Sequence, residues 1–214
     1  VSIEAPSLKI MLENNLFDTI YHEHYSYLSV TALIPLFKSH GLKIVDVEEL
    51  KTHGGSLRIY VAKENSHWER TDSVDSILKK EAEFDPRSNL IWKSLQEKTL
   101  NVKMDLVSEL IFCKKMGLKV AAYGAAAKGN TLLNYCGIKS DLIDFVVDLN
   151  THKQVKYLPG SSIPIVGLEH LAENTPDVLV VLPWNLSDEI KNQLSEFSQS
   201  GMRFLRAIPN LEYF

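Results

Sequence analysis

The second half of this 214-residue chain alternates strand-like and helix-like segments in a regular order. This alternation restricts the fold more than any other feature, because strands that are apolar on both faces need helices to cover them. Strands are predicted where β-branched and other apolar residues run together, at residues 119–123, 142–148, 163–166, 177–182 and 203–208. Helices are predicted between strands, at residues 131–135, 167–174 and 187–200. Repeated units of this kind predict an α/β, Rossmann-like domain with a parallel sheet over residues 117–214.

The first half predicts a smaller group of elements followed by helices. Strands are expected at residues 1–6, 43–47 and 56–61, and a helix at 29–40 that Gly41 stops. The short separation of the last two strands predicts an antiparallel pair at the edge of a mixed sheet. From residue 66 to residue 116 the apolar residues recur at helical spacing, interrupted by Asp85-Pro86. We therefore expect a partial sheet domain over 1–64 and a helical connector over 65–116.

Charge and cysteine usage exclude several classes of protein. The net charge is −4 and the lysines are spread along the chain, so no basic surface for nucleic acid or an anionic membrane is predicted. No apolar run reaches the roughly 20 residues that span a bilayer, and no signal peptide is recognisable. Cys113 and Cys136 lack C-x-x-C spacing, which predicts reduced, buried thiols. These features are typical of a cytoplasmic protein.

Tyr21-His22-Glu23-His24-Tyr25 concentrates side chains that exchange protons, and is here called the catalytic run after the role that this composition predicts. Two imidazoles flank a carboxylate, and on an extended segment residues two apart face the same side. The run is therefore a candidate site for acid–base chemistry. The alternative interpretation is a set of satisfied polar residues at the edge of a strand or helix. A metal site made by His22, His24 and His53 is a further alternative, although no H-E-x-x-H occurs.

A second candidate site follows the first strand of the Rossmann-like domain. Gly124, Ala126 and Gly129 match G-x-A-x-x-G, a weak form of the dinucleotide fingerprint, at the start of a helix. Asp148 lies about 20 residues further on, where a ribose hydroxyl can be bound, and Lys128 adds a positive charge. The pattern predicts binding of a nucleotide or diphosphate. In the alternative interpretation the small residues permit close packing and Asp148 starts a turn.

Three long motifs, in order, resemble the S-adenosylmethionine-dependent sugar C-methyltransferases, which act on nucleotide-linked keto-deoxysugars. The motifs are residues 17–27 (FDTIYHEHYSY), 52–58 (THGGSLR) and 121–135 (AAYGAAAKGNTLLNY). The resemblance covers essentially the whole chain. It implies that residues 1–64 are the carboxyl-terminal portion of a methyltransferase domain and that residues 117–214 are the family's Rossmann-like carboxyl-terminal domain.

The resemblance also implies that parts of the family's architecture precede Val1. Neither the family's cysteine cluster for zinc nor the glycine-rich first-strand motif of its methyltransferase domain is present. We therefore expect an incomplete chain, inactive alone, whose cofactor S-adenosylmethionine binds mainly outside it. Ala126 stands where relatives often have Pro, and Thr151 and Val155 where they tend toward Pro and Gly.

The reaction implied by the resemblance is removal of a proton next to a ketone, followed by methylation of that carbon. His24 would be the base, Tyr21 and Glu23 would bind the sugar or fix the imidazole tautomer, and His22 would support the enolate oxygen. No metal is required. Further substrate-binding residues are expected on two segments: His53, Ser56 and Arg58; and Tyr123, Gly124, Ala126, Lys128, Gly129, Asn130 and Asp148. Arg58 could instead be a structural strut. The loop at residues 124–130, here called the Rossmann loop, could bind no ligand.

The expected partner is a dTDP-sugar type of nucleotide-linked sugar. The alternative function is that of a catalytically silent nucleotide- or nucleotide-sugar-binding module. A hydrolase using Ser56 is disfavoured because Gly54-Gly55-Ser56 lacks the G-x-S-x-G elbow. An exposed edge strand in the partial sheet predicts self-association as a homo-oligomer.

Overall fold

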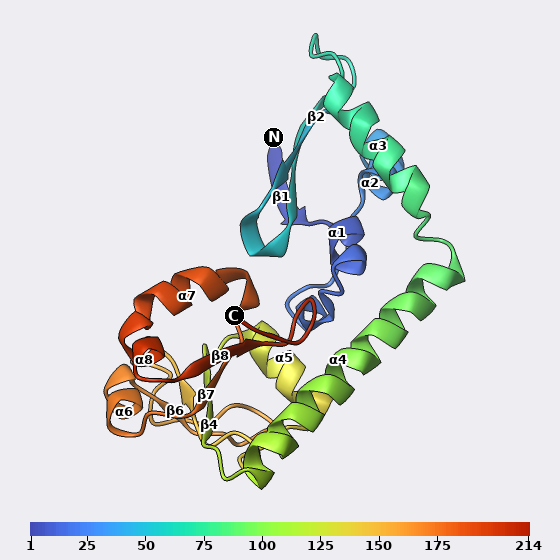
Figure 1. Cartoon of the computed structure of the whole chain (residues 1–214). Coiled ribbons are helices and arrows are strands. Elements are labelled where there is room, and N and C mark those ends of the chain that lie inside the picture. Colours follow the sequence, from blue (N-terminus) through green and yellow to red (C-terminus); the bar gives the residue numbers. More distant parts are fainter. The chain divides into compact units, whose positions relative to one another are not determined.

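The computed structural model describes residues 1–214, apart from the side chain of His53, and divides into two compact units. The first unit comprises Val1–Phe17 and His22–Glu97, and the second comprises Asp18–Tyr21 and Lys98–Phe214 (Figure 1). A four-residue piece of the amino-terminal half is thus part of the second unit. The division falls inside the second helix of the expected connector, while the domain assignment made from the sequence stays a prediction.

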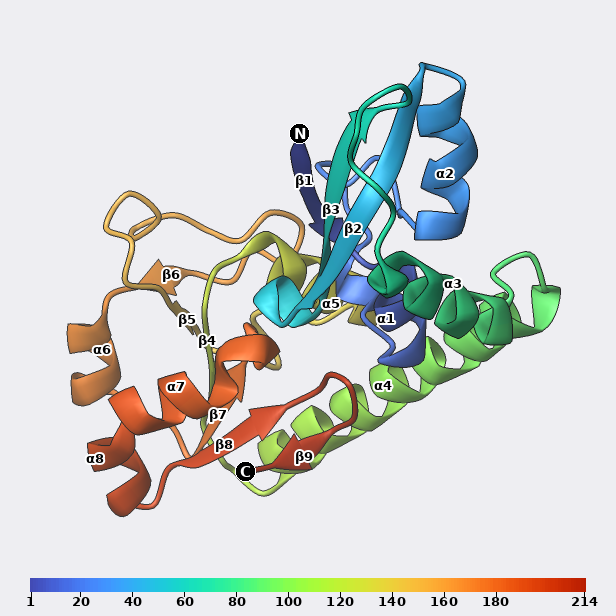
Figure 2. The ribbon, with the colours of Figure 1, turned by 90° about the horizontal axis from the view of Figure 1, so that it is seen from above.

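The first unit is built on a three-stranded antiparallel sheet of order β1-β3-β2. Its strands are β1 (Ser2–Pro6), β2 (Leu42–Leu50) and β3 (Ser56–Lys63). Its helical elements are α1 (Leu8–Glu13), η1 (Phe17–Thr19, whose last two residues belong to the second unit), α2 (Val30–Lys38), η2 (Thr52–Gly54) and α3 (Asp72–Phe84). Apolar residues of α2 and α3 pack against β2 and β3 in one core, and Figure 2 shows both helices beside these strands. The predicted strands and the helix ending before Gly41 are confirmed, with every pair antiparallel.

The second unit contains a six-stranded sheet of order β6-β5-β4-β7-β8-β9. The strands are β4 (Val120–Tyr123), β5 (Val146–Val147), β6 (Ile165–Val166), β7 (Val178–Val181), β8 (Arg203–Arg206) and β9 (Glu212–Tyr213). All neighbours are parallel except β8 and β9. The predicted α/β fold of Rossmann-like type is therefore confirmed.

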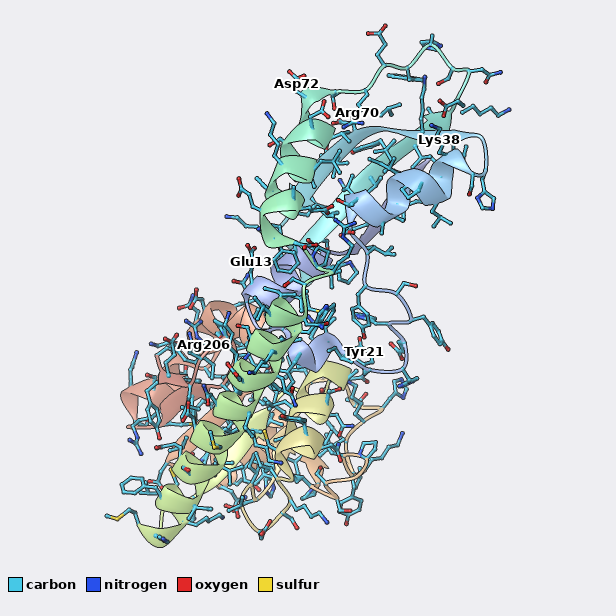
Figure 3. All side chains as sticks on the ribbon, turned by 90° about the vertical axis from the view of Figure 1, so that its right-hand side faces the viewer. Glu13, Tyr21, Lys38, Arg70, Asp72 and Arg206 are labelled. Carbon is cyan, nitrogen blue, oxygen red and sulfur yellow. The ribbon has the colours of Figure 1, made fainter. Side chains whose placement is uncertain are left out.

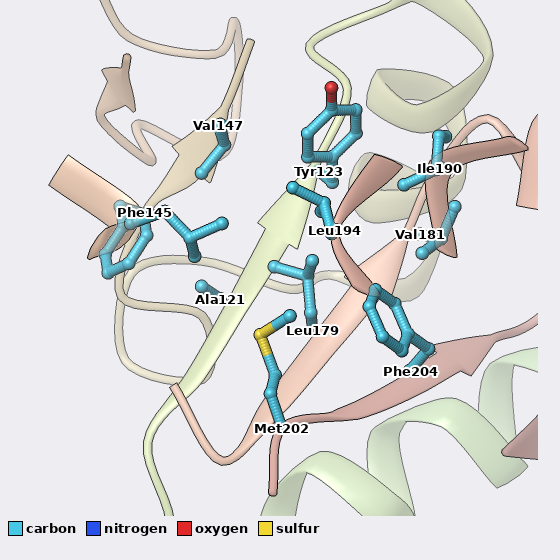
Figure 4. Packing of buried hydrophobic residues seen from close by; sticks show 11 residues of the cluster. Ala121, Tyr123, Phe145, Val147, Leu179, Val181, Ile190, Leu194, Met202 and Phe204 are labelled. Carbon is cyan, nitrogen blue, oxygen red and sulfur yellow. The ribbon is translucent and has the colours of Figure 1, made fainter. Parts of the chain in front are cut away.

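Helices lie on both sides of this sheet. They are α4 (Asn89–Lys115, which begins in the first unit), α5 (Ala127–Cys136), α6 (Leu168–Glu173), η3 (Trp184–Leu186), α7 (Ser187–Gln193) and α8 (Ser195–Gln199). Residues of α6 and α7, together with Leu194 and Phe197, share one core with β4, β7 and β8. Figure 4 shows Ile190 and Leu194 in this core. None of the helices in the described part of the chain is both long and apolar enough to cross a membrane.

Three predicted boundaries in the second unit are wrong, two of them for a local reason. The strand expected at 142–148 shrinks to Val146–Val147, because residues before it turn and the Ile143 N–H donates to the Lys139 carbonyl. The helix expected at 187–200 breaks at Leu194, whose backbone leaves helical geometry while its side chain is buried in the core. The helix expected at 131–135 begins four residues earlier, at Ala127.

Candidate functional site

The catalytic run follows η1 and is only partly buried. Tyr21 and His24 are half-buried, His22 and Glu23 are exposed, and 93% of Tyr25 is exposed. Figure 3 labels Tyr21 at the start of this segment. The backbone bends at Tyr21 and turns at His22 and Glu23, so the extended geometry assumed from the spacing is wrong. The turn leaves polar side chains of the run accessible to a substrate.

Asp18 lies three residues before the run and is completely buried. Its Oδ2 accepts a hydrogen bond of 2.7 Å from the indole Nε1–H of Trp184, in η3. The other carboxylate oxygen, Oδ1, is also buried and takes no hydrogen bond of normal geometry from the described groups. Burial raises the pKa of Asp18, although the Trp184 hydrogen bond, the charge of Lys128 and nearby backbone N–H groups oppose that rise. The carboxylate is therefore held in an energetically unfavourable place.

Lys128, which we expected to face a phosphate, lies against the same indole. Its Nζ is 5.2 Å from the centroid of the Trp184 ring, a cation–π distance. Burial lowers the pKa of Lys128, and the charge of Asp18 raises it. Asp18, Trp184 and Lys128 thus form one cluster within the second unit, here called the anchor cluster.

The glycines of the Rossmann loop contact the segment that leads to Trp184. Gly124 has φ +93°, and a Cβ built there would lie 2.4 Å from Pro183 Cγ. A Cβ on Gly129 would lie 2.6 Å from Leu182 Cβ. This contact lies where the loops after β4 and β7 diverge, the place at which open α/β sheets usually bind ligands. Both glycines are needed for packing, which supports the structural interpretation of the motif.

Asp148 is engaged by its own loop. Its Oδ2 accepts from the Ala125 N–H at 2.8 Å and from Lys153 Nζ at 3.1 Å, while Oδ1 accepts from the Asn150 N–H at 2.9 Å. Lys153 also donates to the Ala125 carbonyl at 2.8 Å. The carboxylate therefore ties two loops together and takes up a backbone N–H that a bound anion would need. Nucleotide binding at this loop stays a prediction.

The other predicted loop residues have different surroundings. The Tyr123 ring is part of the core (Figure 4). Its hydroxyl donates to Gln193 Oε1 at 3.4 Å. Ala126 is exposed and precedes α5. Asn130 Oδ1 is buried without a hydrogen-bond partner among the described groups. Val155 has φ +59°, a left-handed conformation that favours glycine.

The residues predicted on the 52–58 segment belong to the first unit. Arg58 forms ion pairs with Glu4 at 3.0 Å and Glu48 at 3.5 Å, on the strands that flank β3. Ser56 is buried, and its hydroxyl donates to the Thr52 carbonyl at 3.2 Å. These contacts support the strut interpretation of Arg58. The side chain of His53 lies outside the described residues.

Two further observations concern metal and thiol chemistry. Within the described part of the chain, no group of three or more His, Cys, Asp or Glu side chains is placed to hold a metal ion. Cys113 and Cys136 are free and buried, as predicted, and burial raises the pKa of the Cys136 thiol to about 11. A thiol in such a place is unreactive.

Sequence reasoning missed both members of the Asp18–Trp184 pair. The two residues are 166 positions apart, and a lone tryptophan after a strand carries no local signal of its partner. Asp18 lies inside the quoted FDTIYHEHYSY motif, so its place beside the catalytic run was the one available hint.

Comparison with known proteins agrees with these motifs. Residues 51–209 match the family model described as the C-methyltransferase C-terminal domain. The chain is also 38% identical over 207 residues to the C-methyltransferase NovU of Streptomyces niveus, covering 97% of this chain and 49% of NovU. It thus spans about half the length of this curated relative. The match over most of its length and the Rossmann-like second unit place this chain in the C-methyltransferase C-terminal domain family.

Proposed function

We propose that this chain is the carboxyl-terminal part of an S-adenosylmethionine-dependent C-methyltransferase. The substrate is a nucleotide-linked keto-deoxysugar of the dTDP-sugar type, methylated on a carbon next to its ketone. One observation carries the proposal: a run of proton-exchanging side chains is accessible in a chain similar to a C-methyltransferase.

In this proposal His24 removes the proton next to the ketone. Imidazole is the side chain that most readily exchanges protons near neutral pH, and His24 is half-buried, which suits removal of a proton acidified by a carbonyl group. The C–H electron pair moves to form the enolate, and His22 supports its oxygen. Tyr21 and Glu23 bind the sugar or fix the tautomer of His24.

We further propose that the methyl donor is bound by residues outside this chain. Packing of Pro183 and Leu182 against the glycines of the Rossmann loop in the second unit supports this proposal, because it gives those glycines a role without a cofactor. Asp148 is also fully engaged by the chain itself. The buried free thiols support a reducing, cytoplasmic location.

The test is methyl transfer by the full-length protein from S-adenosylmethionine to dTDP-keto-deoxysugars, followed by mass spectrometry. His24→Ala is expected to lower kcat by about 10²- to 10⁴-fold, the usual contribution of a general base. His152→Ala is the matched control, since this exposed histidine lies outside the run. An inactive wild-type protein would leave the silent binding module as the function, whereas His24→Ala at the wild-type rate would show that another residue is the base.

Calorimetric titration of this chain with dTDP tests the loop separately. Binding that Lys128→Ala weakens supports a nucleotide role for residues 124–130. Absence of binding leaves the loop with the packing role that its glycines already have.

A further inference from the structure

The buried carboxylate of Asp18 needs an explanation beyond stability. One of its oxygens receives the Trp184 N–H and the other takes no hydrogen bond of normal geometry from the described groups. An apolar residue or an asparagine at this position would avoid the cost of burying a charge. Groups that are costly to the fold are found mostly where function requires them.

The position of Asp18 in the chain indicates what that function is. Residues Asp18–Tyr21 belong to the second unit, whereas the chain from His22 onward belongs to the first. The hydrogen bond to Trp184 is therefore a fixed point immediately before the catalytic run. Tyr21 follows directly, with its N–H donating to the Thr19 carbonyl at 3.0 Å.

Trp184, the other half of this hydrogen bond, is itself held from several sides. Pro183 packs against Gly124 and Leu182 against Gly129, at contacts too close for any side chain on either glycine. Ser187 Oγ donates to the Trp184 carbonyl at 2.7 Å, and Lys128 lies over the ring. These contacts hold the indole N–H in place just after the carboxyl end of β7, as a positioning contact requires.

We infer that the Asp18–Trp184 hydrogen bond fixes the start of the catalytic run on the second unit and so positions His24 for proton abstraction. This inference rests on the proposed function. Asp18 and Trp184 are positioning residues, because they act through the run. The glycine motif of the Rossmann loop then serves to hold Trp184 in place.

The kinetic test uses the full-length protein. Asp18→Ala and Trp184→Phe are each expected to lower kcat about 10- to 100-fold, the effect of misplacing a reacting group by about 1 Å. KM for the nucleotide sugar is expected to stay within about threefold, since neither residue binds it. The double variant is expected to be no worse than the poorer single variant, because one hydrogen bond is lost in all three. Asp18→Asn is expected to restore much of kcat, since its amide oxygen accepts the same N–H.

Trp92→Phe is the matched control. The Trp92 indole N–H also donates a hydrogen bond, to the Pro86 carbonyl at 2.8 Å, but on the surface of the first unit. It is expected to leave kcat unchanged. If Trp92→Phe lowers kcat as much as Trp184→Phe, the effect is general destabilisation and the inference fails.

A second readout does not depend on activity. In the ¹⁵N-labelled 214-residue chain, the Trp184 indole N–H is expected to exchange slowly with solvent and to shift in Asp18→Ala. An unshifted, fast-exchanging resonance overturns the hydrogen bond itself. Normal kcat in both variants, with His24→Ala inactive, overturns the positioning role and leaves the proposed function standing. A wild-type protein without methyl transfer overturns the proposed function, whereas the resonance still reports on the hydrogen bond.

Discussion

The surroundings of two aspartates, one in each unit, shift the carboxyl pKa in opposite directions. Asp46 in the first unit accepts hydrogen bonds from the hydroxyls of Thr71 and Ser73 and from the Val47 N–H, and these lower its pKa. Asp18 in the second unit is buried, its Oδ2 accepts the Trp184 indole N–H, and burial raises its pKa. The first carboxylate stabilises the fold around it. The second is tolerated at a cost, and we attribute that cost to the chemistry of the neighbouring run.

The largest effect on stability is expected where the second unit holds Trp184. Gly124→Ala adds a Cβ 2.4 Å from Pro183 at a positive φ, so strain and overpacking together are expected to cost about 2–4 kcal/mol. Gly41→Ala is the matched control, since its φ is +69° but nothing lies within 4 Å, and about 1 kcal/mol is expected. Chemical denaturation of the chain measures both. Equal losses would mean that the contact with Pro183 is not tight.

Asp46→Asn is expected to have a smaller effect that depends on pH. Because the folded-state pKa lies below the ordinary value of 3.8, Asp46 contributes stability above that pH and loses it as pH falls through the folded pKa. At neutral pH the variant is expected to be less stable by about 1 kcal/mol, given that the site is partly exposed. The difference should vanish in acid. Unfolding curves at several pH values would contradict this if the gap stayed constant.

Asp18→Asn is expected to change the stability at neutral pH in the opposite direction, making the variant more stable than wild type. The change is expected to be smaller than for Asp46→Asn, because Trp184 and Lys128 offset part of the cost of burying the carboxylate. The folded-state pKa is raised, so wild type loses stability relative to the variant as pH rises from 3.8 through the folded pKa. The same unfolding series measures it. If the variant were less stable than wild type at neutral pH but not in acid, the Asp18 carboxylate would be well solvated in the fold.

Arg58→Gln is expected to have the smallest effect. The guanidinium bridges Glu4 and Glu48 at the surface, and exposed pairs contribute little that salt does not screen. We expect a slight loss of melting temperature that disappears at high ionic strength, with KM for the nucleotide sugar unchanged. A large rise in KM would instead place Arg58 in the substrate site.

The fold was largely predictable because its signals are local. Apolar runs such as Val178–Val181 and the αL stop at Gly137 identify a strand and a helix end without knowledge of their neighbours. Short strands were harder, since β9 has only two residues. The helix over 187–200 looked continuous because periodicity does not show that Leu194 turns into the core.

The candidate site was predictable only in part, for the same reason. The sequence locates the catalytic run and the Rossmann loop, but it does not show that Pro183 fills the space beside Gly124. Nor does it show that Asp148 is satisfied by Lys153 and Ala125. The contacts of Gly124 with Pro183 and of Asp148 with Ala125 join segments more distant in the sequence, so a local pattern does not predict them.

Exchange of the substrate proton with solvent deuterium tests the proposed chemistry most directly. The full-length protein is incubated in D₂O with a dTDP-keto-deoxysugar and S-adenosylhomocysteine, so that deprotonation occurs without methylation, and NMR follows the carbon next to the ketone. We expect exchange with wild type and a rate lower by about a hundredfold or more with His24→Gln. No exchange with wild type, or equal exchange with His24→Gln, would contradict the assignment of His24 as the base.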